Sequence, residues 1–301
     1  MAEKLYLPDL LAIQLKSVVH LVESGLLKEG KILIHRGLVA EAERLASEGD
    51  TLALEGLEKL VNACKAVGIA VQYVGASSNG DRLAILEEAR RRGASLVTCD
   101  PITAKMASSQ GVEVLYELPP PPFRIHELFT DEIMSLHLKE GVPPRVKRGS
   151  PRSWRLEEII DKPVTREEIE LTLAHLMREA YISLGIDAFL EVDKPSVKIF
   201  QLKDFRIVAT RPPFSDGFEL TVVRPKIRKR LVDYGLPMKV LDRLETRAEG
   251  ILVAGGPGMG KSTFAQALAE HYRSLNKIVK TIESPRDLQL SPDITQYSKS
   301  A

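Results

Sequence analysis

The sequence is poor in cysteine, lacks any long hydrophobic run and carries almost no net charge. Two cysteines, Cys64 and Cys99, in 301 residues exclude a disulfide-bonded scaffold, and a reducing cytoplasm is the expected compartment. No stretch of 18 apolar residues is present, so no membrane-spanning helix is expected. The 42 basic and 41 acidic residues leave a net charge of +1. Any surface that binds nucleic acid must therefore be local.

The composition that remains is ordinary for a globular protein, and the length suits two domains or slightly more. In the first third, short apolar runs alternate with segments of helical periodicity. The expected strands are Leu5–Pro8, Ile32–Ile34, Ile69–Val74, Ser95–Thr98 and Val112–Tyr116, and the expected helices are Leu10–Glu23, Leu38–Ser47, Leu54–Val67, Arg82–Arg91 and Ile102–Ser109. Strands that alternate with helices predict a three-layer α/β domain with a parallel sheet over residues 1–118.

Residues 119–160 are rich in proline and basic side chains, and we interpret them as a linker. Pro119–Pro122 cannot continue a helix or a central strand. No acid lies between Glu140 and Glu157, a stretch that holds five basic residues. The segment is either a solvated connection or a local patch that contacts phosphates.

A second domain is expected over residues 161–248. Thr165 and Glu168 have the spacing of a capping box, and the helix that follows carries apolar residues on one face. The expected strands then follow without intervening helices: Ala188–Val192, Val197–Leu202, Phe205–Thr210 and Phe218–Val223. This order predicts an α+β domain, an antiparallel meander packed by one helix.

A phosphate-binding loop follows the apolar run Gly250–Ala254, which we expect to be a buried strand. The loop matches G-x-x-x-x-G-K-[ST] and consists of Gly255, Gly256, Pro257, Gly258, Met259, Gly260, Lys261, Ser262 and Thr263. Glycines let backbone N–H groups turn toward a phosphate, and the next helix adds its positive N-terminus. Lys261 is expected to reach the β- and γ-phosphates of ATP, and the Ser262 hydroxyl to bind Mg²⁺.

The next expected strand, Lys277–Glu283, ends in an acid. At that edge of a parallel sheet, Glu283 either orients the attacking water, holds the metal, or is an ordinary surface acid. The further strands and the second acidic motif of a P-loop core are not found before Ala301. We therefore expect residues 249–301 to be the start of a truncated P-loop domain that does not hydrolyse ATP by itself.

Four acids of the first domain are candidates for a Mg²⁺ or Mn²⁺ site. Asp9 and Asp100 each follow an expected strand, so both should lie at the same sheet edge. Glu41 lies one turn into the helix after the second strand, and Asp81 opens the helix before Asp100. Clustered carboxylates are what a metal-dependent nuclease needs. The alternative is that each is a helix cap or a surface acid.

The order strand–Asp9, then Leu38–Glu43, then Thr98–Asp100 resembles a PIN domain, a Mg²⁺-dependent nuclease fold, over residues 1–118. The family usually has a further acid in the helix before the last pair of strands. Leu83 stands at that position, and Asp81 lies two residues earlier. The resemblance thus implies a PIN-like fold and leaves nuclease activity open.

The segments Arg206–Arg224, the loop, and Thr281–Arg286 are similar to those of archaeal PIN-domain-containing ATPases, whose RecA-like motor resembles the hexameric type IV pilus and secretion ATPases. This similarity implies ATP and Mg²⁺ as cofactors, Glu283 as the catalytic or metal-associated acid, and Arg211 and Arg224 as arginines that reach the phosphates. It also implies a homohexamer that acts on nucleic acid with recombination or repair proteins. An assembly motor with a PIN-like scaffold and a PIN ribonuclease are the alternatives.

Overall fold

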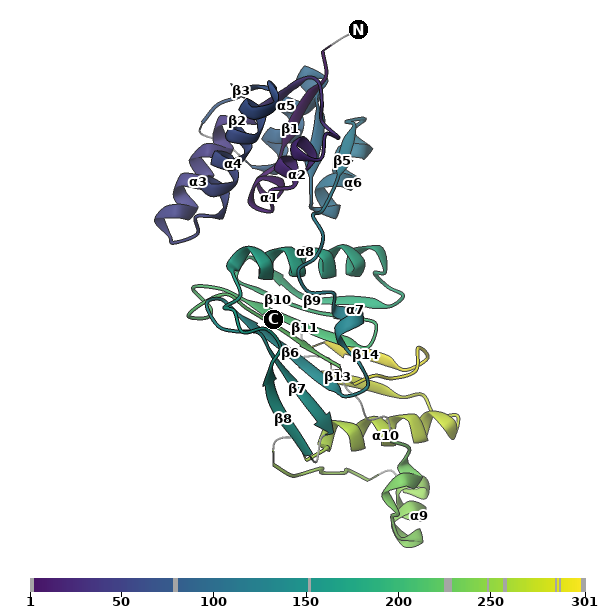
Figure 1. The fold of residues 1–301 in the computed structure, drawn as a ribbon. Coiled ribbons are helices and arrows are strands. Elements are labelled where there is room, and N and C mark those ends of the chain that lie inside the picture. Colours follow the sequence, from purple (N-terminus) through teal and green to yellow (C-terminus); the bar gives the residue numbers. More distant parts are fainter. Residues whose placement is uncertain are drawn as a thin grey trace.

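The computed structural model describes residues 3–77, 81–150, 153–224, 229–247, 249–256, 259–284, 286 and 288–298. The chain forms an elongated stack (Figure 1). A parallel sheet with its helices lies at one end, an antiparallel sheet lies in the middle, and a smaller helical part with two short strands lies at the other end. The predicted α/β class is confirmed: the first domain has a parallel sheet and the second an antiparallel sheet.

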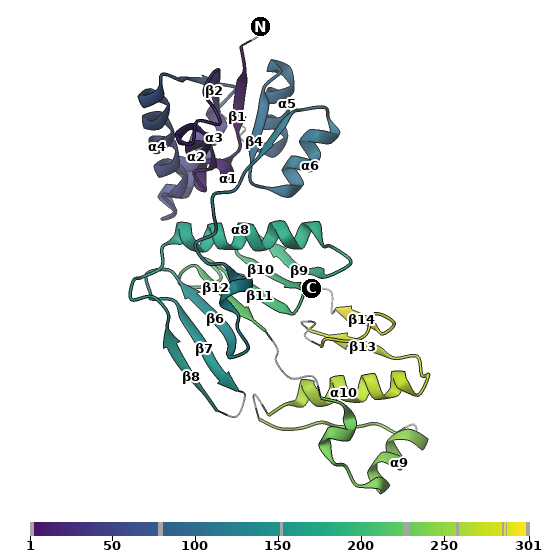
Figure 2. The ribbon, with the colours of Figure 1, turned by 45° about the vertical axis from the view of Figure 1, so that its right-hand side comes forward.

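The first domain, residues 5–116, is built on a five-stranded parallel sheet of order β3-β2-β1-β4-β5. Its strands are β1 (Leu5–Pro8), β2 (Lys31–His35), β3 (Ala70–Val74), β4 (Ser95–Thr98) and β5 (Val114–Tyr116). Helices cover both faces of the sheet (Figure 2): α1 (Leu10–Gln14), α2 (Ser17–Glu23), α3 (Arg36–Ser47) and α4 (Leu52–Val67) on one, α5 (Arg82–Arg92) and α6 (Pro101–Ser109) on the other.

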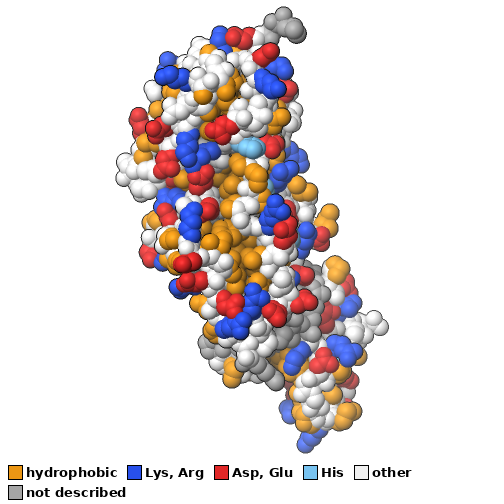
Figure 3. All heavy atoms as spheres, viewed as in Figure 1, with side chains coloured by type: hydrophobic (Ala, Val, Ile, Leu, Met, Phe, Trp, Pro, Cys, Tyr) orange, Lys and Arg blue, Asp and Glu red, His pale blue; other side chains and the backbone are white. Residues whose placement is uncertain are grey.

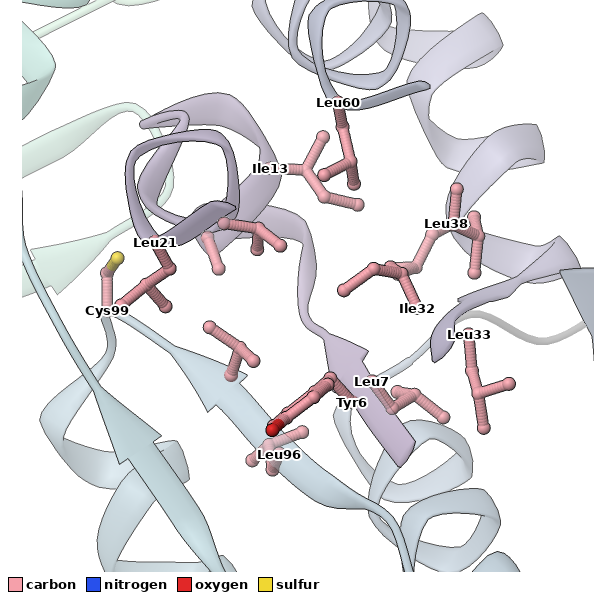
Figure 4. Packing of buried hydrophobic residues seen from close by; sticks show 14 of the residues in the cluster. Tyr6, Leu7, Ile13, Leu21, Ile32, Leu33, Leu38, Leu60, Leu96 and Cys99 are labelled. Carbon is pink, nitrogen blue, oxygen red and sulfur yellow. The ribbon is translucent and has the colours of Figure 1, made fainter. Parts of the chain in front are cut away.

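The helix predicted over Leu10–Glu23 is in fact two helices. Lys16 has φ 54°, a left-handed conformation that separates α1 from α2. Two helices end at glycines: Gly68 and Gly93 are the C-caps of α4 and α5 and have positive φ. The β-branched and leucine side chains of the strands fill one continuous core, in which Leu7, Ile32 and Leu96 are fully buried (Figure 4).

The second domain, residues 133–223, is a seven-stranded antiparallel sheet of order β8-β7-β6-β12-β11-β10-β9. Its strands are β6 (Ile133–Lys139), β7 (Arg145–Ser150), β8 (Ser153–Glu158), β9 (Ala188–Lys194), β10 (Val197–Leu202), β11 (Phe205–Thr210) and β12 (Glu219–Val223). The linker prediction is therefore wrong for residues 133–158, which follow the short helix α7 (Ile125–Leu128). The sequence of β7 gives no apolar alternation, because only Val146 of this strand is buried. The segment becomes a strand through its pairing with β6.

Helix α8 (Arg166–Ile182) packs on one face of this sheet (Figure 1). The predicted capping box is confirmed: the Thr165 side chain accepts from the Glu168 backbone, and the Glu168 carboxylate accepts from the Thr165 backbone. The helix ends at Ile182, and Leu184 just beyond it is exposed.

The last part of the chain contains the 3₁₀ helix η1 (Leu231–Tyr234), the helices α9 (Met238–Thr246) and α10 (Lys261–Ser274), and a parallel pair of strands, β13 (Lys280–Glu283) and β14 (Thr295–Ser298). The buried strand predicted over Gly250–Ala254 is wrong. These residues form no regular element, and Leu252 is 93% exposed. Throughout the described ranges, no helix is long and apolar enough to span a bilayer.

Candidate functional site

The four candidate acids of the first domain line one pocket, which we call the acid pocket. The strands β1 and β4 are neighbours at the point where the sheet order reverses, and Asp9 and Asp100 lie one and two residues beyond their carboxyl ends. Crevices at such switch points are the usual ligand sites of open α/β sheets. The pocket has a volume of about 670 Å³, and its charged lining consists of Asp9, Glu41, Asp81, Asp100, Arg44 and Arg82.

Asp9 is the buried acid of this pocket. Its Oδ1 accepts a hydrogen bond of 2.8 Å from the Ala12 backbone and so caps α1, while Thr98 Oγ1 donates to its Oδ2. Burial raises the pKa of Asp9 to about 6, and the Asp100 charge adds to the rise. The two hydrogen bonds and the Arg82 charge oppose it. A proton on this carboxyl thus competes with any cation near neutral pH.

Two arginines already bind two of the acids. Arg44 donates to Glu41 through Nε at 2.9 Å and Nη2 at 2.7 Å, and these hydrogen bonds lower the pKa of Glu41. Arg82 Nη2 lies 2.6 Å from Asp100 Oδ2, across 18 residues of sequence. The pocket therefore contains its own positive charges next to its acids.

Helix capping accounts for part of the acidic pattern. Asp9, Asp81 and Asp100 are the N-caps of α1, α5 and α6, with side chains that accept from Ala12, Ala84 and Ile102. Among the residues that the structure describes, no group of three or more His, Cys, Asp or Glu is arranged to hold a metal ion. In this arrangement the acids do not fit a Mg²⁺ ion, and their role as metal ligands stays a prediction.

At the phosphate-binding loop, Pro257 and Gly258 lie outside the described residues. Gly260 has φ 86° and begins α10, as the glycine-rich pattern requires. Lys261 Nζ donates to the carbonyl oxygens of Gly255 and Gly256, at 2.9 Å each. Ser262 and Met259 are exposed. The lysine thus lies folded back over the first residues of its own loop.

Glu283 lies at the end of β13, as predicted, and belongs to a polar network with β14. Its Oε1 accepts from Thr281 Oγ1 at 2.6 Å and from Gln296 Nε2 at 3.0 Å, and its Oε2 accepts from the Leu288 backbone at 3.0 Å. The carboxylate therefore contacts β14 and a backbone group of the segment that precedes it. Its catalytic role stays a prediction.

The two candidate arginines have partners within the chain. Arg211, after β11, donates to Glu170 of α8 at 2.8 Å and lies over the Phe218 ring at 4.3 Å. Arg224, after β12, donates to the Thr130 carbonyl. Helices α8 and α10 lie on opposite sides of the antiparallel sheet (Figures 1 and 2), and Arg211 contacts the α8 side.

The basic run that might have contacted phosphates is largely ion-paired. Arg145 binds Glu158 at 2.8 Å, and Arg148 binds Glu157 at 2.7 Å. Lys147 instead lies over the ring of Trp154 at 3.9 Å. On the face shown in Figure 3, acidic and basic side chains are interspersed. This face therefore offers no large area of one sign.

Sequence reasoning missed Arg44 and Arg82 as pocket residues. Arg44 had a signal, because residues three apart on a helix are neighbours and Glu41 precedes it by three. Arg82 had none, since its pairing with Asp100 depends on how α5 lies across the sheet.

The chain is similar to two longer curated proteins. It is 40% identical over 276 residues to the Holliday junction branch migration ATPase PINA of Sulfolobus acidocaldarius, covering 90% of this chain and 54% of that protein. It is 40% identical over 298 residues to a KH- and PIN-domain-containing protein of Methanocaldococcus jannaschii, covering 93% of this chain and 46% of that protein. The chain thus spans about half the length of these relatives.

No protein-family model matches the chain. The solved structure of the pilus retraction motor PilT with bound ADP is 21% identical, with a TM-score of 0.36, and the match covers 56% of this chain and 48% of PilT. The resemblance to PIN-domain-containing ATPases is confirmed, since one of the two curated relatives is named as an ATPase and the other as a KH- and PIN-domain-containing protein.

Proposed function

We propose that this chain is the PIN-like and nucleotide-binding part of an ATP-hydrolysing motor that acts on branched DNA in the cytoplasm. One observation carries the proposal: the 40% identity over 276 residues to a protein named for Holliday junction branch migration. The complete signature from Gly255 to Ser262 within the same chain supports the ATPase part.

In this proposal, Lys261 exchanges its acceptors when nucleotide binds. Its Nζ now donates to two neutral carbonyl oxygens at 2.9 Å. Phosphate oxygens are charged acceptors, and charge-assisted hydrogen bonds are stronger than neutral ones. The start of α10 adds backbone N–H groups and the positive end of the helix dipole. Ser262 would hold Mg²⁺, which neutralises phosphate charge. Glu283 would be the acid that orients the attacking water or holds the metal.

We further propose that the motor is a ring of identical chains, as the resemblance to hexameric ATPases implies. Arg211 is held by Glu170 on the α8 side of the antiparallel sheet. An arginine in that place can contact the phosphates of a nucleotide bound by a neighbouring copy of the chain. Arg224 is the second candidate for such a contact.

The first experiment measures binding of Mg²⁺–ADP by calorimetry to the wild type, Lys261→Ala and Lys277→Ala. Lys277 is a matched control, since it lies beyond the same helix and donates to the Glu245 carbonyl at 3.1 Å. We expect Lys261→Ala to weaken binding at least about tenfold, because a charge-assisted bond is lost, and Lys277→Ala to leave it unchanged. Equal binding by all three proteins would contradict the nucleotide assignment.

The second experiment compares a four-way DNA junction with a linear duplex of the same base composition, at several salt concentrations. The proposal expects tighter binding to the junction and an affinity that falls as salt rises, because phosphate contacts release counterions. Failure to bind either DNA would favour the assembly-motor alternative. Metal-dependent RNA cleavage that Asp9→Asn abolishes would favour the ribonuclease.

A further inference from the structure

Helix α8 is buried on two opposite faces and belongs to both hydrophobic cores. Leu171 and Ala174, each 9% exposed, pack into the core of the first domain. Residues on the other face fill the core of the antiparallel sheet: Ile169, Leu173, Leu176, Met177 and Ala180. A helix that forms a wall of two cores cannot move relative to one without changing its packing against the other.

Polar contacts surround the apolar strip where α8 meets the first domain. Lys16 forms an ion pair with Glu167. Arg166 Nη1 donates to the Gly49 carbonyl at 3.2 Å and lies 3.6 Å from Asp50. Further along the helix, His175 Nε2 lies 2.7 Å from the Pro119 carbonyl, and Arg178 lies over the Tyr116 ring at 5.0 Å. The contacts span most of the helix.

We propose that α8 couples the acid pocket to the antiparallel sheet, so that a displacement of one also displaces the other. The most direct route runs through α1. Asp9 caps the first turn of α1 at Ala12, the helix has only five residues, and Lys16 follows it in a left-handed conformation. At about 1.5 Å per residue, α1 is about 7.5 Å long. A shift of Glu167 thus acts on Lys16, which closely follows the short helix whose N-cap is Asp9.

A second route runs through Arg82. Its guanidinium binds Asp100 in the pocket at 2.6 Å. Its charge also reaches Asp193 of β9: burial raises the pKa of Asp193, but hydrogen bonds from Lys198 and Tyr181, together with the charges of Lys198 and Arg82, lower it overall. Tyr181 belongs to the last turn of α8 and donates to Asp193 at 2.8 Å. Arg82 of the acid pocket and the Lys16–Glu167 pair therefore connect the first domain to the second at separate points.

Coupling of this kind is reciprocal. If a ligand at one site changes the binding affinity of the other site, a ligand at the other site changes the affinity of the first by the same factor. If nucleotide binding at Lys261 displaces the antiparallel sheet, the acid pocket should respond. That consequence rests on the proposed function. Coupling between the two domains without ligand does not.

The ligand-free test is hydrogen exchange on the whole chain, with Lys16→Glu, Glu167→Gln and the charge-swapped Lys16→Glu/Glu167→Lys. We expect both single variants to exchange about fivefold or more faster in α1 and also around Tyr181 and β9, and the double variant to recover. The control is the exposed pair Arg145 and Glu158, 2.8 Å apart on β7 and β8. Its charge reversal should leave α1 unchanged. Effects confined to the first domain would overturn the proposal.

The second test adds Mg²⁺–ADP. We expect slower exchange in α1 of the wild type, and loss of that effect in Lys16→Glu at equal occupancy of the loop. Protection of residues 259–264 with no change in α1 would overturn the coupling and leave nucleotide binding intact. No protection of residues 259–264 would refute the proposed function, and the ligand-free test would still decide the coupling.

Discussion

The strand β4 and the segment 250–254 have similar apolar sequences and very different surroundings. Leu96 and Val97 in β4 are 0% exposed, whereas Leu252 is 93% exposed. β4 has hydrogen-bonded strands on both sides and contacts α1, α5 and α6. Residues 250–254 pair with no strand in the part of the chain that the structure describes. An apolar run becomes a buried strand only where tertiary structure supplies neighbours on its edges and faces.

The same difference holds for the second strand near the loop. Ile282 in β13 is 82% exposed although its backbone pairs with β14. Two strands satisfy some backbone hydrogen bonds but cover little side-chain area. Backbone hydrogen bonding and side-chain burial are therefore separate properties, and Ile282 of β13 has the first without the second.

The largest expected effect tests burial directly. Leu96→Ala should lower the free energy of unfolding by about 2–5 kcal/mol, because it removes apolar contacts and leaves a cavity in a fully packed core. Leu252→Ala should change it by less than about 0.5 kcal/mol, since the side chain is already solvated. Urea unfolding of both variants measures the difference. A large loss for Leu252→Ala would show that residues 250–254 are packed in solution.

The second prediction concerns Asp9, the buried acid of the first domain. Its pKa is about 6 in the folded protein, against 3.8 without burial. The unfolded chain therefore releases this proton first as pH rises. Between about pH 4 and 6, Asp9 progressively destabilises the fold, by about 2–3 kcal/mol in total, and adds nothing further above that range.

Asp9→Asn removes this titration. The difference in unfolding free energy between the wild type and the variant should change across pH 4–6 and be constant at higher pH. Denaturant unfolding at several pH values checks this. Asp233→Asn is the control from the region near the loop, because Asp233 accepts a hydrogen bond from the Arg230 backbone at the exposed η1. A difference that does not vary with pH for Asp9→Asn would mean that the carboxyl titrates normally.

The smallest effect compares two glycines. A Cβ on Gly56 of α4 would lie 2.1 Å from the Ile13 carbonyl oxygen of α1, whereas a Cβ on Gly250 meets nothing within 4 Å. Alanine favours a helix by about 1 kcal/mol over glycine. We nevertheless expect Gly56→Ala to destabilise by about 1 kcal/mol or more, since overpacking costs about 1–3 kcal/mol. Gly250→Ala should be close to neutral in thermal unfolding. A stabilised Gly56→Ala would show that α1 and α4 can separate freely.

Much of the first domain could be predicted because its signals are local. Alternating apolar runs and helical periodicity identified all five strands of the parallel sheet, and strand ends placed Asp9 and Asp100 at one edge. The pairing of Asp100 with Arg82 could not be predicted, since it joins residues 18 apart through the packing of α5. The acidic pattern therefore indicated a pocket and said nothing of the cations that line it.

Helix α8 shows which features the sequence by itself determines and which depend on tertiary packing. The capping box at Thr165 and Glu168 and one apolar face are written in residues three and four apart, and they determined where the helix begins and which side meets the antiparallel sheet. The burial of Leu171 and Ala174 on the other side was decided only by the tertiary structure. One leucine and one alanine on that side are too few to predict a second buried face from the sequence. Their environment depends on a domain whose sheet ends some fifty residues earlier, and such distant partners are selected by packing and not by periodicity.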